Sequence, residues 1–133
     1  MKMLVDTGAL LALALRRDQH HARAAAFARQ HPDARFVLTD LILVETVTRL
    51  RARGGAPLAA RAGRSLLAGG RRYEVLFADA PLVTSALARL EQFGDKALSL
   101  TDCVSFETMD RLGLTTAFAF DRDFRDCGYH TLP

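Results

Sequence analysis

The sequence contains few of the residues that mark disulfide-rich, membrane-spanning or zinc-binding proteins. Only two of its 133 residues are cysteines, Cys103 and Cys127, and their separation matches no zinc-ligand spacing. This argues against a disulfide framework and is compatible with a reducing cytoplasm. No stretch approaches the length and apolar character of a membrane span, and the apolar segment 8–15 is too short for a signal peptide. We therefore expect a cytoplasmic protein that has neither a membrane span nor a signal peptide.

The motifs of several common catalytic sites are also missing. The chain has no phosphate-binding P-loop, no glycine-rich dinucleotide motif and no nucleophile elbow. Its four histidines show no spacing typical of metal ligands. The search for a functional site therefore turns to the carboxylates.

Lysine is scarce, so the positive charge is almost entirely arginine. Only two of the 18 basic residues are lysines, and the net charge is +3. Residues 49–72 contain seven arginines and no acid, whereas residues 99–126 contain six acids and three arginines. Arginine suits bidentate contacts with phosphate or carboxylate groups. The basic segment thus predicts an anionic partner, and a solvated helix face remains the alternative.

Half of the residues are hydrophobic, enough for one domain over residues 1–133. Apolar runs alternate with segments of helical periodicity, which predicts an α/β fold with a mostly parallel sheet of about five strands flanked by helices. The expected strands are 3–5, 35–38, 73–78, 115–120 and 129–132. The expected helices are 8–17, 20–31, 40–54 (with residue 39 or 40 as its cap), 57–67, 81–93 and 99–112.

Four acidic residues occupy positions where folding alone does not call for a charge. Asp6 and Asp121 each directly follow an apolar run. Glu45 lies beside an apolar run, and Asp102 is in the first turn of a helical segment. Functional sites of parallel sheets form at the carboxyl ends of strands, where these acids are expected to meet. Converging carboxylates repel one another unless a cation lies between them, so the pattern predicts a divalent metal site.

Each acid also has a purely structural interpretation. Asp6 is suited to cap the helix that follows it, and Glu45 to pair with an arginine four residues on. Asp102 closes the sequence Ser99-Leu100-Thr101-Asp102, which resembles a capping box. Asp121 fits an ordinary acidic turn. The order of the four acids along an α/β pattern favours the metal site over four coincidences.

The segments that carry the acids resemble the motifs of PIN domains, and most of all those of VapC-type toxins from type II toxin–antitoxin pairs. They are Met3-Leu4-Val5-Asp6-Thr7, the segment from Thr39 to Glu45, Ser99-Leu100-Thr101-Asp102-Cys103 and Phe120-Asp121-Arg122-Asp123-Phe124. The resemblance covers essentially the whole chain. PIN domains often carry threonine or serine two residues before the last acid, where this sequence has Ala119. Asp121 and Asp123 therefore both remain open as the fourth acid.

The resemblance implies a magnesium- or manganese-dependent endoribonuclease that cleaves single-stranded or looped RNA. It implies four catalytic acids: Asp6, Glu45, Asp102 and Asp121. Of these, Asp6, Asp102 and Asp121 are expected to bind the metal, with Thr7, Ser99 and Asp123 in support. The expected RNA-binding residues are Arg61, Arg64, Arg71 and Arg72. The expected partners are RNA, a cognate antitoxin protein and a second copy of the chain in a homodimer, with no membrane.

Three other functions compete with this interpretation. The first is a PIN-type nuclease of RNA maturation or decay that has no antitoxin. The second is a non-catalytic module that binds RNA or protein. The third is a phospho-accepting receiver domain, which needs adjacent acids after its first strand and a late lysine. Asp6 stands alone and no lysine follows Lys96, which disfavours the receiver domain.

Overall fold

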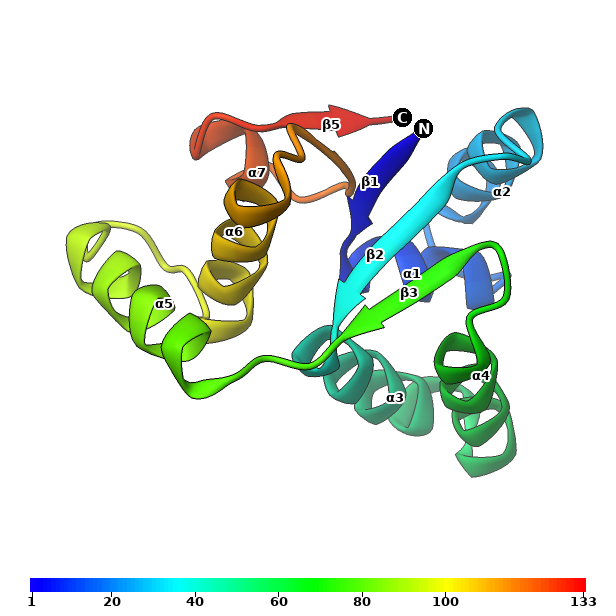
Figure 1. Cartoon of the computed structure of the whole chain (residues 1–133). Helices are drawn as coiled ribbons and strands as arrows, with labels where there is room; N and C mark the ends of the chain where they lie inside the picture. The colour runs from blue at the N-terminus through cyan, green and yellow to red at the C-terminus, as the bar shows by residue number, and fades with distance from the viewer.

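Five strands alternate with seven helices along the chain, and the computed structural model describes all residues, 1–133 (Figure 1). The strands are β1 (Lys2–Val5), β2 (Arg35–Thr39), β3 (Tyr73–Leu76), β4 (Thr116–Phe118) and β5 (His130–Leu132). The helices are α1 (Thr7–Ala14), α2 (His21–Gln30), α3 (Asp40–Gly54), α4 (Ala56–Ala68), α5 (Ala80–Gln92), α6 (Leu100–Leu112) and α7 (Asp123–Asp126).

The strands form one sheet in the order β3-β2-β1-β4-β5, and all four neighbouring pairs run parallel. The predicted fold class is therefore confirmed, with β1 at the centre. In parallel strands the carboxyl ends share one edge of the sheet and the amino ends share the other. Residues that follow the strands meet at one edge, and residues that precede them meet at the opposite edge.

The helices form two groups around the sheet. In Figure 1, α5, α6 and α7 lie to the left of the strands, whereas α1 to α4 lie to the right and below. Gly55, at the junction of α3 and α4, has φ of 88°, a conformation open to glycine at little cost. It lets α4 fold back against α3, and the two helices pack together.

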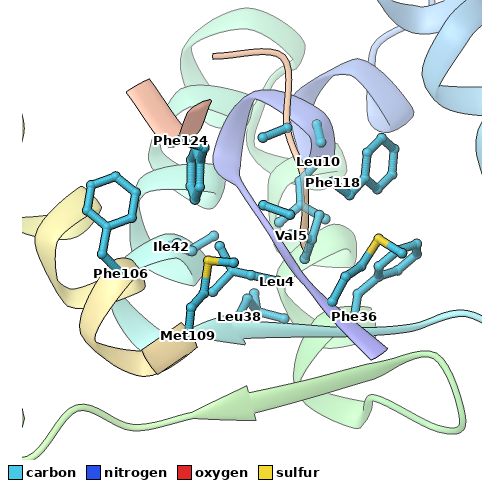
Figure 2. Packing of buried hydrophobic residues seen from close by; sticks show 14 of the residues in the cluster. Leu4, Val5, Leu10, Phe36, Leu38, Ile42, Phe106, Met109, Phe118 and Phe124 are labelled. Atoms are coloured by element: carbon cyan, nitrogen blue, oxygen red, sulfur yellow. The ribbon is translucent and has the colours of Figure 1, made fainter. Parts of the chain in front are cut away.

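The core is built on both faces of the central strand. Met3, Leu4 and Val5 are all fully buried, as expected for a parallel strand covered by helices on both sides. In Figure 2, Leu4 points toward Met109 of α6, and Val5 points toward Leu10 of α1. Successive side chains of a strand alternate between its faces, so this strand joins the two helical groups into one core.

Strand β4 is shorter than predicted. The apolar run was expected to remain a strand to residue 120, but its ladder ends at Phe118. The neighbouring strand β1 turns into α1 after Asp6, so β4 has no partner on that side beyond this point. The predicted acidic turn after Asp121 is instead the short helix α7, and Phe124 on this helix is fully buried.

Two other boundaries also differ from the prediction. Strand β3 ends at Leu76, two residues before the predicted end, and just beyond it the backbone N–H of Ala78 donates to the carboxylate Oδ1 of Asp40 at 2.9 Å instead of to a neighbouring strand. Of the two residues expected as the cap of α3, Thr39 is the one that caps the helix. Helix α1 ends at Ala14 instead of residue 17 because Leu15 is extended. No helix has both the length and the apolar character needed to span a membrane.

Candidate active site

A polar pocket of about 260 Å³ opens at the carboxyl edge of the sheet. Five carboxylates and one arginine line it, although they come from widely separated parts of the sequence. Its residues are Asp6, Thr7, Gly8, Glu45, Arg49, Ala97, Ser99, Asp102, Asp121 and Asp123. The structure thus brings together all four acids that the sequence singled out and the three residues expected to support them. We call this the acidic pocket.

Asp6 is the most buried acid of the pocket, with 8% of its surface exposed. Its backbone N–H donates to the carbonyl oxygen of Phe118 at 3.1 Å, which fixes the residue at the end of β1. Asp6 is the N-cap residue that precedes α1, yet its side chain makes no capping hydrogen bond, so the interpretation of this acid as a helix cap was wrong. Helix capping therefore does not explain why a carboxylate is buried at this position.

Burial raises the pKa of Asp6 to about 7. The backbone N–H of Thr7 lowers the pKa in part, but the nearby carboxylates of Asp102, Asp121 and Glu45 raise it further. A charge placed in a dry site next to like charges is unstable without a counter-ion. The pocket therefore favours a bound cation.

Glu45 faces the pocket from α3, with both carboxylate oxygens engaged. The Thr7 hydroxyl donates to Oε2 at 3.1 Å, and the Arg49 guanidinium lies 3.1 Å from Oε1. The ion pair suggested by the four-residue spacing is thus present, and it sits at the pocket rather than away from it. Arg49 lines the pocket too. Sequence reasoning treated Arg49 only as a partner, although its spacing from Glu45 already placed both on one helix face.

Asp102 has both of the roles that the sequence offered. Its Oδ2 accepts from the backbone N–H of Ser99 at 3.0 Å, and the Ser99 hydroxyl accepts from the backbone N–H of Asp102 at 3.0 Å. This is the predicted capping box at the start of α6. It uses only one carboxylate oxygen, so Oδ1 remains available to the pocket. Asp102 therefore caps α6 with one oxygen and still lines the acidic pocket.

Asp121 and Asp123 both line the pocket, so neither is eliminated as the fourth acid. Asp121 is exposed, and its Oδ1 accepts from the backbone N–H of Asp123 at 2.9 Å, at the start of α7. Partial burial and the charges of Asp121 and Asp102 raise the pKa of Asp123. Asp126 lies outside the pocket and is 3.8 Å from Arg122.

The donor set suits a hard divalent cation, because carboxylate oxygens are the ligands such ions prefer. No three carboxylate, histidine or cysteine side chains in the structure stand close enough together to form a complete direct ligand set. The carboxylates surround an open space, which fits an ion held partly through its own water molecules, as magnesium commonly is. Asp6, with its raised pKa, is the residue whose charge most requires such an ion.

The arginines expected to bind RNA fall into two groups. Arg61 and Arg64 are exposed on α4. Arg71 and Arg72 precede β3 and so lie at the amino edge of the sheet, opposite the acidic pocket. Arg72 donates to the backbone oxygens of His31, Pro32 and Ala28 at 2.8, 3.0 and 2.9 Å. These contacts give Arg72 a structural role that the sequence did not reveal.

The largest cavity of the molecule, of about 640 Å³, lies away from the acids. Arg89 of α5 is at its wall and contacts Glu107 at 3.0 Å, Asp110 at 2.5 Å and the Tyr129 hydroxyl at 3.1 Å. The guanidinium of Arg89 is shared between the two carboxylates and the hydroxyl, and these contacts tie α5 to α6 and to the C-terminal segment. We therefore assign this network to stability.

Comparisons with known proteins agree with this fold. The profile of the PIN domain family matches residues 3–128. The chain is 31% identical over 127 residues to the 23S rRNA-specific endonuclease VapC20 of two Mycobacterium tuberculosis strains, CDC 1551/Oshkosh and H37Rv, covering 96% of this chain and 95% of the relative.

Solved structures show the same architecture. The crystal structure of Mycobacterium tuberculosis VapC20, described as a sarcin–ricin-loop-cleaving toxin, is similar with a TM-score of 0.88 and 28% identity, covering 96% of this chain and 95% of that one. VapBC2 from Rickettsia felis, bound to a DNA fragment from its promoter, has a TM-score of 0.70 at 12% identity, covering 98% and 97%, and supports the fold alone. The family match spans nearly the whole chain, and the resemblance found in the sequence is confirmed: this protein belongs to the PIN-domain family and, within it, to the VapC-like proteins.

Proposed function

We propose that this protein is a metal-dependent endoribonuclease and the toxin of a toxin–antitoxin pair. The observation that carries the proposal is the acidic pocket, where four further carboxylates from distant parts of the sequence line the same space as the buried Asp6. Its similarity to a protein named as a 23S rRNA-specific endonuclease supports RNA as the substrate. A looped segment of ribosomal RNA is the substrate class we infer, because a solved relative is described as cleaving the sarcin–ricin loop.

We propose Asp6, Asp102 and Asp121 as the metal-binding residues, with Asp123 as the alternative to Asp121. Magnesium or manganese, when bound, supplies an acidified water molecule and offsets the charge of the scissile phosphate. The residues of the chain position these groups. The capping box fixes Asp102 through Oδ2 and leaves its Oδ1 without a hydrogen bond, and β1 holds Asp6 on a rigid backbone.

Glu45 completes the catalytic set in this proposal. The Thr7 hydroxyl and the Arg49 guanidinium each hold one of its oxygens, so its orientation is fixed before RNA arrives. Glu45 accepts hydrogen bonds from the water that attacks the phosphorus. Arg49 stands where its positive charge faces the RNA phosphate, because it is the one basic residue that lines the pocket.

We propose two protein partners, an antitoxin and a second copy of this chain. Support for the antitoxin comes from the similarity to VapC20, whose solved structure is described as that of a toxin. Co-expression with the product of the neighbouring gene, followed by size-exclusion chromatography with light scattering, tests both partners. A protein that cleaves RNA but binds no neighbouring gene product would instead be an RNA maturation or decay nuclease.

The proposed function is tested by cleavage of stem–loop RNA by Asp6→Asn and Asp102→Asn. Both variants should lose cleavage while the far-UV circular dichroism spectrum stays native. Asp126→Asn is the matched control, since Asp126 is an acid of the same region outside the pocket, and it should cleave like wild type. Chelation should stop wild-type cleavage, and added magnesium or manganese should restore it. Wild-type rates in either pocket variant would refute the metal assignment.

A further inference from the structure

A second polar pocket, of about 380 Å³, lies at the amino edge of the sheet, opposite the acidic pocket. Four charged residues and one proline line it: Pro32, Asp33, Arg35, Arg71 and Arg72. Three positive charges face one negative charge, so this basic pocket carries a net charge of +2. The two ends of the sheet therefore present pockets of opposite charge.

The parallel sheet explains why these arginines meet. Arg35 is the first residue of β2, and Arg71 and Arg72 immediately precede β3. The two strands are hydrogen-bonded neighbours, with Phe36 opposite Tyr73. Parallel pairing brings the starts of both strands together, just as it brings the acids together at the other edge.

Arg72 forms the rigid wall of the basic pocket. Its guanidinium donates to three backbone oxygens, one in the last turn of α2 and two just after the helix, and it lies over the ring of Phe36 at 5.0 Å. Neutral carbonyl partners leave its positive charge in place. The basic pocket thus contains one arginine, Arg72, whose side-chain conformation is fixed by hydrogen bonds.

The other two guanidiniums have donors to spare. Arg71 is exposed and makes no hydrogen bond or ion pair in the structure. Arg35 has 52% of its side chain exposed, and its single carboxylate contact is Glu74 at 3.9 Å. Lys2 occupies the same Glu74 oxygen at the closer distance of 3.1 Å. The guanidiniums of Arg35 and Arg71 can therefore donate hydrogen bonds to an anion beside the fixed charge of Arg72. This arrangement matches the geometry of a phosphate group.

We propose that the basic pocket binds a backbone phosphate of the RNA substrate, away from the phosphate that is cleaved. The identity of the ligand as RNA rests on the proposed function. None of the lining residues offers an aromatic face or an apolar slot for a base, so the pocket contacts the backbone and does not read sequence.

The two pockets are too far apart for one nucleotide to fill both. Lys2 pairs with Arg35 in the sheet register, and Asp6 lies four residues further along β1. At about 3.3 Å per residue, the two levels are separated by about 13 Å along the strand direction. Only a long or folded RNA reaches both ends, so the basic pocket selects substrates by their size and shape.

The test compares Arg35→Ala and Arg71→Ala with Arg111→Ala. Arg111 is an exposed arginine on α6 outside both pockets, so its variant removes the same charge without touching the site. Affinities for a stem–loop RNA and for a short single-stranded oligonucleotide are measured over a range of salt concentrations, in the cleavage-deficient Asp6→Asn protein. Cleavage kinetics are measured in the otherwise wild-type protein.

Both pocket variants should bind the stem–loop roughly threefold to tenfold more weakly, the loss expected for one hydrogen bond of typical net strength. The slope of log affinity against log salt should fall by about 0.7 to 0.9 for each lost phosphate contact. KM for the stem–loop should rise with kcat unchanged, and the short oligonucleotide should bind as before. Arg111→Ala should change neither slope nor affinity beyond its effect on net charge.

Three outcomes would overturn the proposal. In the first, Arg71→Ala behaves like Arg111→Ala; in the second, the short oligonucleotide loses as much affinity as the stem–loop. In the third, inorganic phosphate titrated in nuclear magnetic resonance spectra shifts the Arg71 signals while neither pocket variant weakens RNA binding, which would make the pocket a free-phosphate site. Failure of wild-type protein to cleave any RNA would refute the proposed function instead, because the binding measurements need no cleavage.

Discussion

Replacing Asp6 by asparagine should stabilise the metal-free protein while it abolishes cleavage. The pKa of Asp6 is raised by burial from its ordinary 3.8 to about 7, so the folded state holds this proton far more tightly than the unfolded state. Stability therefore falls as pH rises from about 4 to about 7, where the folded protein is forced to lose the proton. The asparagine variant carries no charge at this site and escapes the penalty.

The size of the effect follows from the same pKa values. One pKa unit corresponds to about 1.4 kcal/mol, so the change to about 7 amounts to at most about 4 kcal/mol at pH 8. Solvent that enters the open pocket reduces the penalty, and we expect Asp6→Asn to be about 2 to 4 kcal/mol more stable than wild type at pH 8. At pH 4 the folded-state carboxyl is neutral, and the difference should nearly vanish.

Urea denaturation in the presence of a chelator, at several pH values, measures this difference. A divalent ion should remove most of this difference at pH 8, because an ion at one hundred times its Kd stabilises the wild type by about 2.7 kcal/mol and leaves the variant unchanged. A difference between the two proteins that does not vary between pH 4 and pH 8 would refute the assignment of the raised pKa to Asp6. Equal stabilisation of both by the ion would refute its role as a ligand.

Three further predictions concern the parts of the fold around the pocket. Ser99→Ala should cost about 1 kcal/mol of stability through loss of the helix cap, whereas Asp102→Asn should lose cleavage outright, and thermal unfolding with a cleavage assay separates the two effects. Arg89→Met should destabilise the protein by about 3 kcal/mol in urea denaturation, since two carboxylates lose their shared partner; a change below 1 kcal/mol would show that the network contributes little. Among the late acids, Asp121→Asn should reduce the cleavage rate at saturating magnesium more than Asp123→Asn, and the reverse order would move the fourth acid by two residues.

The sequence predicted the central features of this fold for a physical reason. Parallel strands buried on both faces must be apolar throughout, so the run Met3-Leu4-Val5 identified β1 and placed Asp6 at its end. Strand ends in a parallel sheet converge, which is why four acids distant in sequence were expected together. The acidic pocket contains all four of these acids.

The features that the sequence did not predict depend on distant parts of the chain. Phe118-Ala119-Phe120 has the composition of a strand, but β4 stops where β1 turns away, and no local pattern encodes the length of a neighbour. Arg72 looked like a free basic residue because its carbonyl partners lie at the end of α2 and just after it, some forty residues earlier. Capping of α6 by Ser99 was predicted correctly because a capping box is local.

The central place of β1 divides the acidic pocket into a fixed half and an adjustable half. The Asp6 amide is bonded within the sheet, between residues that are fully buried, so it exchanges its hydrogen only when the whole domain opens. Asp121 lies instead on the exposed stretch between β4 and the four-residue helix α7. Core substitutions around β1 should therefore reduce activity by displacing Asp6, whereas the exposed residues around Asp121 can change at little cost to folding as long as the buried Phe124 of α7 is kept. A protein engineer would retune the site from α7 and leave β1 untouched.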